Sequence, residues 1–236
     1  MMRKWLIFLL ILVPLCIVIA MKEGKKYAII RYVALGDSYT IGEGAKQGEA
    51  FPDLLVWHLN YIQRNSHDSL IWFDGGIALS ANPSVTGYTT QNLIEKELPV
   101  FDTIKPHFCT LLIGVNDWVQ GVDSGTFHKN LNYIIDHVLS AKSKLILITI
   151  PDFGVTPTGK MYSGGRDISK GITEFNDIIK SEAHKRNLPI VDIFPESQKM
   201  KDNPDLIAHD GLHPSAKEYA LWGKLIFPVA YKLFKD

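Results

Sequence analysis

The feature that most constrains the fold is a regular alternation of apolar runs with segments of helical periodicity. Predominantly apolar runs, typical of strands in a covered parallel sheet, occupy residues 28–35, 108–113, 144–150 and 189–193, and the run 108–113 is the most continuous. Segments with apolar side chains at three- and four-residue spacing separate these runs, most regularly over residues 126–140. Crossovers between parallel strands need intervening segments of that length. The alternation therefore predicts one α/β domain with helices on both faces of a parallel sheet.

The fifth strand of the expected sheet has two candidates, residues 71–73 and residues 77–81, and the Gly-Gly pair between them leaves both open. Residues 153–171 lack periodicity and are expected to form a long loop that contacts the substrate. A last helix follows Ser215, whose spacing to Glu218 predicts a capping box. The other helices are expected over residues 51–61, 89–98, 126–140 and 172–186.

The first residues differ from the rest of the chain. Residues 5–21 are unbroken apolar sequence, preceded by Arg3 and Lys4 and followed by three lysines. The run is longer than the apolar core of a usual signal peptide and shorter than a comfortable transmembrane helix. We therefore expect residues 1–26 to be a cleaved signal peptide or a retained membrane anchor with a short linker, and residues 27–236 to form the folded domain. Either outcome predicts an extracytoplasmic location.

Charge and cysteine content exclude several classes of protein. The chain has 25 Lys+Arg and 25 Asp+Glu, so no basic bias points to nucleic acid. Removing residues 1–20 takes away Arg3 and Lys4 and leaves 23 basic and 25 acidic side chains, a net charge of −2. The only cysteine in that exported part is Cys109, so no intramolecular disulfide can form there. Because Cys109 lies inside an apolar run, we expect it in the core.

A candidate nucleophile stands where the first strand is expected to end. The apolar run 28–35 stops at Gly36-Asp37-Ser38, and open α/β sheets bind ligands at the carboxyl ends of their strands. Gly36 permits a sharp turn, and Ser38 would then lie on the exposed rim. The same residues are common in ordinary turns. A serine hydroxyl is a weak nucleophile until a base takes its proton, so the assignment depends on finding partners.

The histidine best placed to act as that base is His213. It lies after the last expected strand and directly before the last helix, at the same edge of the sheet as Ser38. Asp210 precedes it by three residues across a turn, so its carboxylate could hold one imidazole nitrogen while the other points toward Ser38. The alternative is a metal site made of His209, Asp210 and His213, which would leave Ser38 without a role.

Two further strand exits supply donors for the oxyanion that forms during acyl transfer. Asn116 follows the run 108–113, and Gly87, whose N–H has no side chain to cover it, follows the second strand. Each of these segments alone could be an ordinary turn. Four aromatic side chains near the strand exits are candidates for lining an acyl or sugar pocket, with core packing as the alternative: Tyr39, Tyr88, Trp118 and Tyr162.

In chain order, these segments resemble the four sequence blocks of the SGNH, or GDSL-type, hydrolases: Gly36-Asp37-Ser38, Gly87, Gly114-Val115-Asn116-Asp117 and Asp210-Gly211-Leu212-His213. The resemblance extends from about residue 28 to the C-terminus. It implies a three-layer α/β/α, flavodoxin-like fold with a five-stranded parallel sheet. Tyr39 departs from the leucine in the family's name. The Gly-x-Ser-x-Gly elbow of the neighbouring α/β-hydrolases is absent.

The resemblance also implies a role for each site residue. Ser38 is expected as the nucleophile, His213 as the base and Asp210 as the acid that orients it. The backbone of Ser38, Gly87 and Asn116 are expected to form the oxyanion hole.

The sequence therefore predicts a metal-independent serine esterase, without a cofactor, that cleaves a small-molecule, lipid or glycan ester through an acyl-enzyme on Ser38. We expect a monomer with no nucleic-acid partner, and contact of the N-terminal segment with a membrane. Three alternatives remain open at this point: an O-acetyltransferase, a deacetylase of a cell-envelope glycan, and a non-catalytic binding module.

Overall fold

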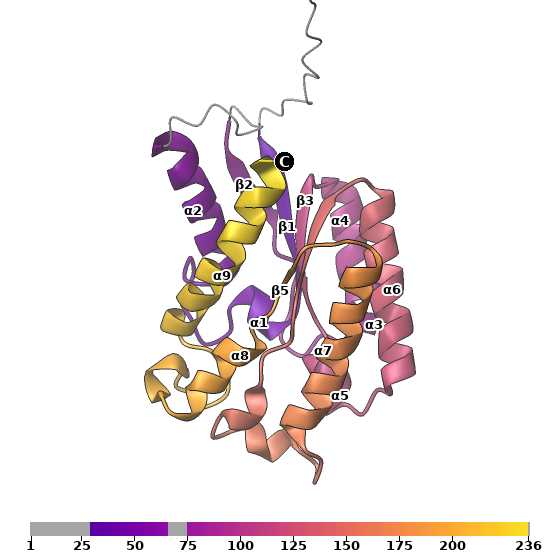
Figure 1. Cartoon of the computed structure of the whole chain (residues 1–236), viewed down its shortest axis with the longest axis vertical. Helices are drawn as coiled ribbons and strands as arrows, with labels where there is room; N and C mark the ends of the chain where they lie inside the picture. The colour runs from indigo at the N-terminus through magenta and orange to yellow at the C-terminus, as the bar shows by residue number, and fades with distance from the viewer. Residues whose placement is uncertain (1–28, 66–74, 236) are drawn as a thin grey trace, which may run out of the picture.

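A five-stranded parallel sheet runs through the middle of the molecule (Figure 1), and the computed structural model describes residues 29–65 and 75–235. The strand order is β2-β1-β3-β4-β5, which is the flavodoxin-like order. The predicted fold class is thus confirmed. The strands are β1 (Ile30–Gly36), β2 (Ile77–Ala81), β3 (Phe108–Leu112), β4 (Lys144–Ile148) and β5 (Ile190–Val191).

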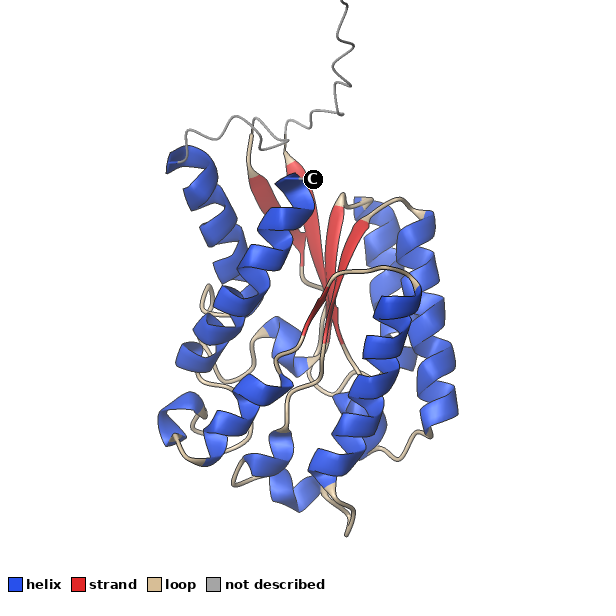
Figure 2. Cartoon of the chain, in the orientation of Figure 1, coloured by secondary structure: helices blue, strands red, loops and turns tan. Residues whose placement is uncertain are grey.

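Helices cover both faces of the sheet and complete three layers (Figure 2). The principal helices are α2 (Phe51–Asn65) and α9 (Ala216–Lys235), which pack together on one face, and α4 (Leu98–Ile104), α6 (Ser124–Ser140) and α7 (Ile168–Lys185) on the other. The shorter segments are α1 (Ser38–Ile41), α3 (Thr90–Asn92), the π-helical η1 (Leu93–Glu97), α5 (Val115–Val119), α8 (Phe194–Ser197) and the 3₁₀ turns η2 (Phe153–Val155), η3 (Gly159–Tyr162), η4 (Gln198–Lys201) and η5 (Pro204–Leu206). No helix of the described residues is long and apolar enough to cross a bilayer.

The apolar runs became strands because burial on both faces needs apolar side chains at every position. All five residues of β3 are buried, and Cys109 within it has no exposed surface, as expected of a core residue. Of the two candidates for the remaining strand, residues 77–81 form β2, beside β1. Residues 71–73 lie outside the described residues.

The long loop expected over residues 153–171 is shorter than predicted. It contains the two 3₁₀ turns η2 and η3, and α7 begins at Ile168 rather than at residue 172. The helix starts earlier because Asp167 caps it, accepting a hydrogen bond from the Lys170 N–H at 3.0 Å. An acidic N-cap outside the apolar stripe moved the boundary by four residues.

Another predicted helix end is wrong, and the capping box predicted at the start of α9 (Ala216–Lys235) is incomplete. The helix expected over residues 89–98 continues to Ile104 through the π-helical turn η1. At the start of α9, Ser215 Oγ accepts a hydrogen bond from the Glu218 N–H at 3.4 Å, but the reciprocal half of the capping box is missing. The Glu218 carboxylate is fully buried and accepts from Trp222 Nε1 at 2.7 Å instead. A buried indole N–H needs a hydrogen-bond acceptor, and the Glu218 carboxylate serves as that acceptor instead of completing the capping box.

Candidate active site

Ser38 is the first residue of α1 and follows directly on β1. An added Cβ at Gly36 would lie 2.3 Å from the Leu112 carbonyl oxygen, so only glycine lets β1 end this close to β3. Asp37 caps α1, its Oδ1 accepting from the Tyr39 N–H at 3.1 Å. Ser38 is 5% exposed, and in the described part of the chain its N–H makes no hydrogen bond. Ser38 is therefore held at the end of β1 with its backbone N–H available to donate a hydrogen bond.

Asp210 and His213 form a tightly bonded pair after the last strand. The Asp210 Oδ2 atom lies 2.6 Å from Nδ1 of His213, and Oδ1 accepts from the N–H groups of Leu212 and His213 at 2.8 and 2.9 Å. Partial desolvation alone would raise the pKa of Asp210, but the hydrogen bonds from the imidazole and the two N–H groups outweigh it and hold the pKa below its ordinary value. The carboxylate therefore stays ionised and fixes which imidazole nitrogen faces the pocket.

Bonds from outside the turn hold this pair in place. The Thr158 hydroxyl donates to the Asp210 carbonyl at 2.8 Å, and the Thr158 N–H donates to the Gly211 carbonyl at 2.9 Å. On the other side, the Ala208 N–H donates to the His213 carbonyl at 2.8 Å. The turn is thus braced against the segment that follows β4, far from it in sequence.

The second and third strand exits bring Gly87 and Asn116 to the same pocket. Gly87 has φ +88°, nothing lies within 4 Å of where its Cβ would be, and its N–H makes no hydrogen bond within the described residues. Nδ2 of Asn116 donates one hydrogen to the Tyr88 carbonyl at 2.9 Å, which leaves the other free. With the Ser38 N–H, the arrangement offers three donors to an oxyanion.

A pocket of about 220 Å³ lies where these groups meet, at the carboxyl edge of the sheet. Both the Ser38 side chain and the His213 imidazole line it, but within the described residues no hydrogen bond joins the two. Catalytic hydrogen bonds of this kind are often formed only when substrate is bound. The pocket is lined by Ser38, Tyr39, Thr86, Gly87, Val115, Asn116, Val119, Phe153, Tyr162, Leu212 and His213.

The four aromatic candidates separate into two pairs. Tyr39 and Tyr162 line the pocket, and the ring of Tyr39 makes an edge contact with His213 at 5.9 Å between centroids. Tyr88 and Trp118 lie outside its lining. Trp118 is 6% exposed and packs beneath the Arg166 guanidinium, whose carbon is 3.9 Å from the ring centroid.

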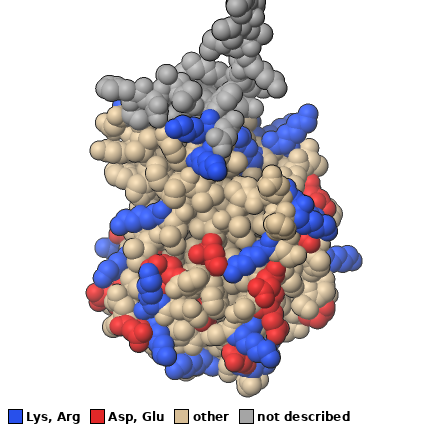
Figure 3. All heavy atoms as spheres, viewed as in Figure 1, with Lys and Arg blue, Asp and Glu red and all other residues tan. Residues whose placement is uncertain are grey.

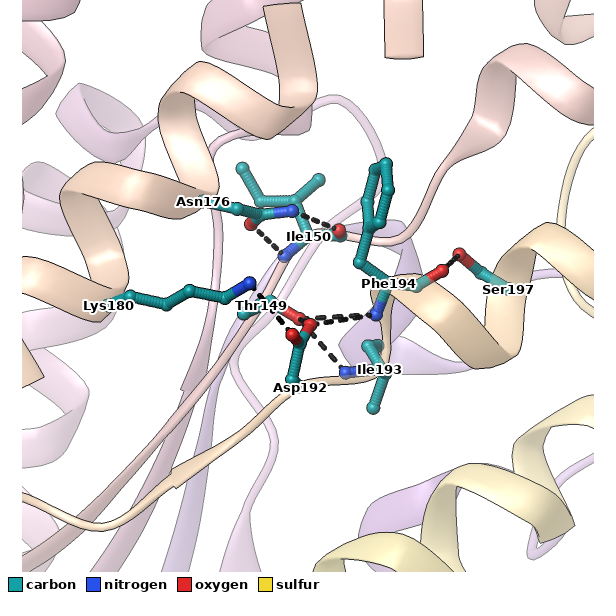
Figure 4. Close-up of polar contacts among 8 residues, drawn as sticks. All are labelled: Thr149, Ile150, Asn176, Lys180, Asp192, Ile193, Phe194 and Ser197. Atoms are coloured by element: carbon teal, nitrogen blue, oxygen red, sulfur yellow. Dashed lines mark hydrogen bonds and ion pairs between the residues drawn. The ribbon is translucent and has the colours of Figure 1, made fainter. Parts of the chain in front are cut away.

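Much of the apolar wall was absent from the sequence-based candidates. Phe153 was not named as a single residue, although it begins the loop over residues 153–171 that was expected to contact the substrate, and the polar cluster in Figure 4 fixes the segment leading to it. The Asn176 side chain bonds both the N–H and the C=O of Ile150, at 2.7 and 2.8 Å. The Thr149 hydroxyl donates to Asp192 at 2.9 Å and so ties β4 to the exit of β5. A polar Asn176 beside the apolar stripe of α7 was the only signal of this bracing in the sequence.

Two fully buried carboxyl groups lie beneath the nucleophile, and sequence reasoning missed both. Glu97, in the π-helical turn η1, accepts from the Gly36 N–H at 3.0 Å, and its Oε1 has no hydrogen bond. Asp37 Oδ2 is likewise unbonded. Desolvation raises the pKa of Asp37 to about 8 and that of Glu97 to about 9, with the Asp37 charge adding to the latter. Both carboxyls are therefore mostly protonated at neutral pH.

The alternative metal site has no support in the arrangement of side chains. Within residues 29–65 and 75–235, no three His, Cys, Asp or Glu side chains gather in a way that could hold a metal ion. His209, the third ligand of that alternative, is exposed, while His213 turns its Nδ1 to Asp210.

The sequence is similar to those of known hydrolases. A sequence profile of the GDSL-like lipase/acylhydrolase family matches residues 34–221. An arylesterase from Vibrio mimicus is 25% identical over 185 residues, which are 78% of this chain and 80% of that protein.

Solved structures agree with the fold. A lipase/acylhydrolase from Enterococcus faecalis aligns with a TM-score of 0.66 at 24% identity, over 84% of this chain and 94% of the other. A catalytic mutant of an acetylxylan esterase from Geobacillus stearothermophilus aligns with a TM-score of 0.66 at 17% identity, over 87% and 96%.

Proposed function

The chain belongs to the GDSL-like lipase/acylhydrolase family, and on that premise we propose that Ser38 is its nucleophile, His213 its base and Asp210 the acid that orients the base. The protein is a carboxylic ester hydrolase, which removes the non-catalytic binding module from the alternatives. The observation that carries the residue assignment is the 2.6 Å bond between Asp210 and His213 at a pocket that Ser38 also lines.

In the proposed reaction, the Ser38 hydroxyl attacks the ester carbonyl while His213 accepts its proton. His213 then gives that proton to the departing alcohol, which leaves the acyl group on Ser38. A water molecule, deprotonated in turn by His213, hydrolyses the acyl-enzyme. The N–H groups of Ser38 and Gly87 and the Asn116 amide stabilise the oxyanion of both steps. Asp210 holds the imidazole and stays ionised throughout.

Substitution of the nucleophile and of one oxyanion donor tests these roles separately. Ser38→Ala should abolish turnover of p-nitrophenyl acetate and labelling by a fluorophosphonate, because no other group can form the acyl-enzyme. Asn116→Ala should keep the labelling and lower kcat by about 10²–10³, since it removes one oxyanion donor. Circular dichroism controls for folding. Turnover by a folded Ser38→Ala variant would refute the assignment.

We further propose that the acyl group is short. The pocket, at about 220 Å³, is smaller than most drug-sized ligand pockets, and Val115, Val119 and Phe153 stand in its lining. A panel of p-nitrophenyl esters from acetate to palmitate checks this. We expect kcat/KM to be at least about tenfold higher for acetate or butyrate than for palmitate, because a long chain cannot be buried there. A maximum at the long chains would contradict the proposal.

We propose that the domain acts outside the cytoplasm. The support is the sequence of residues 1–26, in which an apolar run lies between basic residues, as in signal peptides and membrane anchors. The substrates open to such a domain include small-molecule, lipid and envelope-glycan esters, and hydrolysis of these, rather than transfer to an acceptor, is the reaction proposed.

A further inference from the structure

The end of the molecule opposite the pocket carries a concentration of positive charge. Strands begin at this amino edge of the sheet, and the helices that precede them end here. Figure 3 shows Lys and Arg at the corresponding upper end of the molecule with few acidic side chains beside them, whereas in the lower half Lys and Arg are interspersed with Asp and Glu. The exposed residues that we call the basic edge are Arg31, Arg64, Lys105, Lys142, Lys144, Lys185, Lys232 and Lys235.

Acidic side chains of the helices near the basic edge are paired, and Glu182 of α7 lies 3.8 Å from Lys185 of the edge itself. Asp102 of α4 lies 2.7 Å from His137, and Asp136 of α6 lies 3.1 Å from Arg186. Lys105 and Lys142 also adopt left-handed backbone conformations, with φ of 50° and 60°, at turns where glycine or asparagine is usual. Lysine therefore occupies two positions of the basic edge at which the backbone conformation favours glycine or asparagine.

A row of aromatic rings on α2 and α9, two of them exposed and three half-buried, leads up to the same edge. Trp57 and Tyr61 are 59% and 52% exposed and stack at 5.3 Å. His58 continues the row to Phe227 at 5.7 Å, and Phe227 stacks on Tyr231 at 5.9 Å. We call these five residues the aromatic row. Lys235 of the basic edge lies 6.0 Å above the Tyr231 ring. Trp and Tyr next to Lys and Arg are typical of protein surfaces at the boundary of a bilayer.

The chain also enters the described domain at this edge, since β1 begins at Ile30. Only residues 22–28 separate the apolar run 5–21 from Ile29, the first described residue. Seven residues can span at most about 25 Å when fully extended. If residues 5–21 are a retained membrane anchor, one of the two alternatives for this segment, the basic edge is therefore held close to the lipid surface.

We propose that the basic edge and the aromatic row bind the surface of an anionic phospholipid bilayer. The catalytic pocket, at the opposite edge of the sheet, then faces away from the lipid. In this orientation the pocket is separated from the membrane by the full height of the domain. The enzyme then acts on esters located away from the lipid surface rather than on lipids of the bilayer to which it is bound. The basic edge should bind anionic membranes more tightly than neutral ones, because each lysine near an anionic lipid surface raises the binding constant by about fivefold.

The test uses the full chain with Cys16→Ser, in which Cys109 is buried and a single new cysteine can be labelled. One fluorophore is placed by Asn65→Cys at the end of α2 and another, in a separate protein, by Met161→Cys beside the pocket, where Met161 is 81% exposed. Vesicles of phosphatidylcholine, with or without phosphatidylglycerol, carry a nitroxide quencher on the headgroup. We expect stronger quenching of the label at position 65 on anionic vesicles than on neutral ones, and little quenching at position 161 on either.

Matched lysine variants test the charge. Replacing Lys105, Lys142, Lys232 and Lys235 by glutamine should reduce quenching at position 65 to the level on neutral vesicles, as should salt well above physiological strength. The same exchange of four lysines on the pocket side should change nothing: Lys46, Lys160, Lys201 and Lys217. Equal quenching of both labels, or quenching at position 65 that ignores lipid charge, would overturn the proposal. Turnover of a soluble ester shows that each variant is folded, and this turnover does not depend on whether the variant binds membranes.

Discussion

At the scale of single residues, Glu97 shows how strongly surroundings can change a side chain's chemistry. Its carboxyl group is fully buried, and the only hydrogen bond it makes in the described part of the chain is the one it accepts from the Gly36 N–H. The folded protein therefore keeps the proton on Glu97 up to about pH 9, whereas the unfolded chain releases it near pH 4. Between those values the folded state binds more protons, so stability is complete at low pH and falls as pH rises.

Glu97→Gln should remove this contribution, because glutamine can still accept from the Gly36 N–H and has no proton to lose. We expect the free energy of unfolding, measured with urea between about pH 5 and pH 8, to fall less steeply in the variant, by about 1.4 kcal/mol per pH unit. Glu95→Gln, an exposed neighbour in the same turn, serves as the control and should leave the slope unchanged. Parallel slopes for Glu97→Gln and the wild type would show that Glu97 ionises normally.

Burial also explains why some residues of the site region could be predicted from the sequence and others could not. Ser38, Asp210 and His213 could be found in the sequence because each stands beside a strand or helix end, and Asp210 reaches His213 across a single turn. Glu97 could not, because its burial depends on a π-helical turn and on the packing of that turn against the exit of β1. Charged residues are normally assigned to the surface, and only the tertiary structure reverses that expectation.

At the scale of elements, the contact of α7 with the indole of Trp118 depends on one glycine. An added Cβ at Gly171 would lie 1.8 Å from Trp118 Nε1, so the helix can pack there only without a side chain. Gly171→Ala should therefore lower the free energy of unfolding by about 1–3 kcal/mol, visible as a lower Tm. Activity should suffer less than stability, because Trp118 lies outside the pocket lining.

Gly223→Ala in α9 provides the matched control for that experiment. Both glycines are buried inside helices, but a Cβ at Gly223 would meet nothing closer than Leu54 Cβ at 3.5 Å, an ordinary contact. Alanine there should raise stability by about 0.5–1 kcal/mol through its better helix propensity. Equal changes in the free energy of unfolding for the two substitutions would mean that Trp118 can move aside to make room for a Cβ at position 171.

Element positions were predictable from periodicity, whereas several of their ends were not. The helix over residues 126–140 was expected from its apolar stripe, and the observed α6 begins only two residues earlier, where Asp123 caps it. The starts of α6 and α7 both depend on an acidic cap that lies outside the apolar pattern. Glu218 shows the reverse case, since tertiary packing draws its carboxylate away from the cap that the local sequence favours.

At the scale of the whole molecule, the described part of the chain forms one hydrophobic core that spans all five strands. A unit of this kind should fold alone. We expect residues 27–236, expressed without the preceding segment, to unfold cooperatively and to keep kcat/KM for p-nitrophenyl acetate within about twofold of the full chain's value. An inactive or aggregated product would show that residues 1–26 contribute to the fold.

The strand order, too, was predictable at this scale. Strands alternating with helices predicted a parallel sheet covered on both faces, and the resemblance to the SGNH hydrolases implied the flavodoxin-like order that is observed, with its switch point between β1 and β3. The shape of the pocket was less predictable, because Phe153 reaches it through a loop whose path is set by contacts to α7 and to the exit of β5. Such contacts join residues that are distant in sequence.

The hydrogen bond from Asn116 to the Tyr88 carbonyl has a consequence for the energetics of turnover. It joins the second and third strand exits, so the donors at Gly87 and Asn116 keep a fixed spacing before any ester arrives. In the proposed reaction, the N–H dipoles that stabilise the oxyanion are then already aligned, and little solvent or backbone reorientation is needed to reach the transition state. The order needed for the chemical step is established once, when the chain folds.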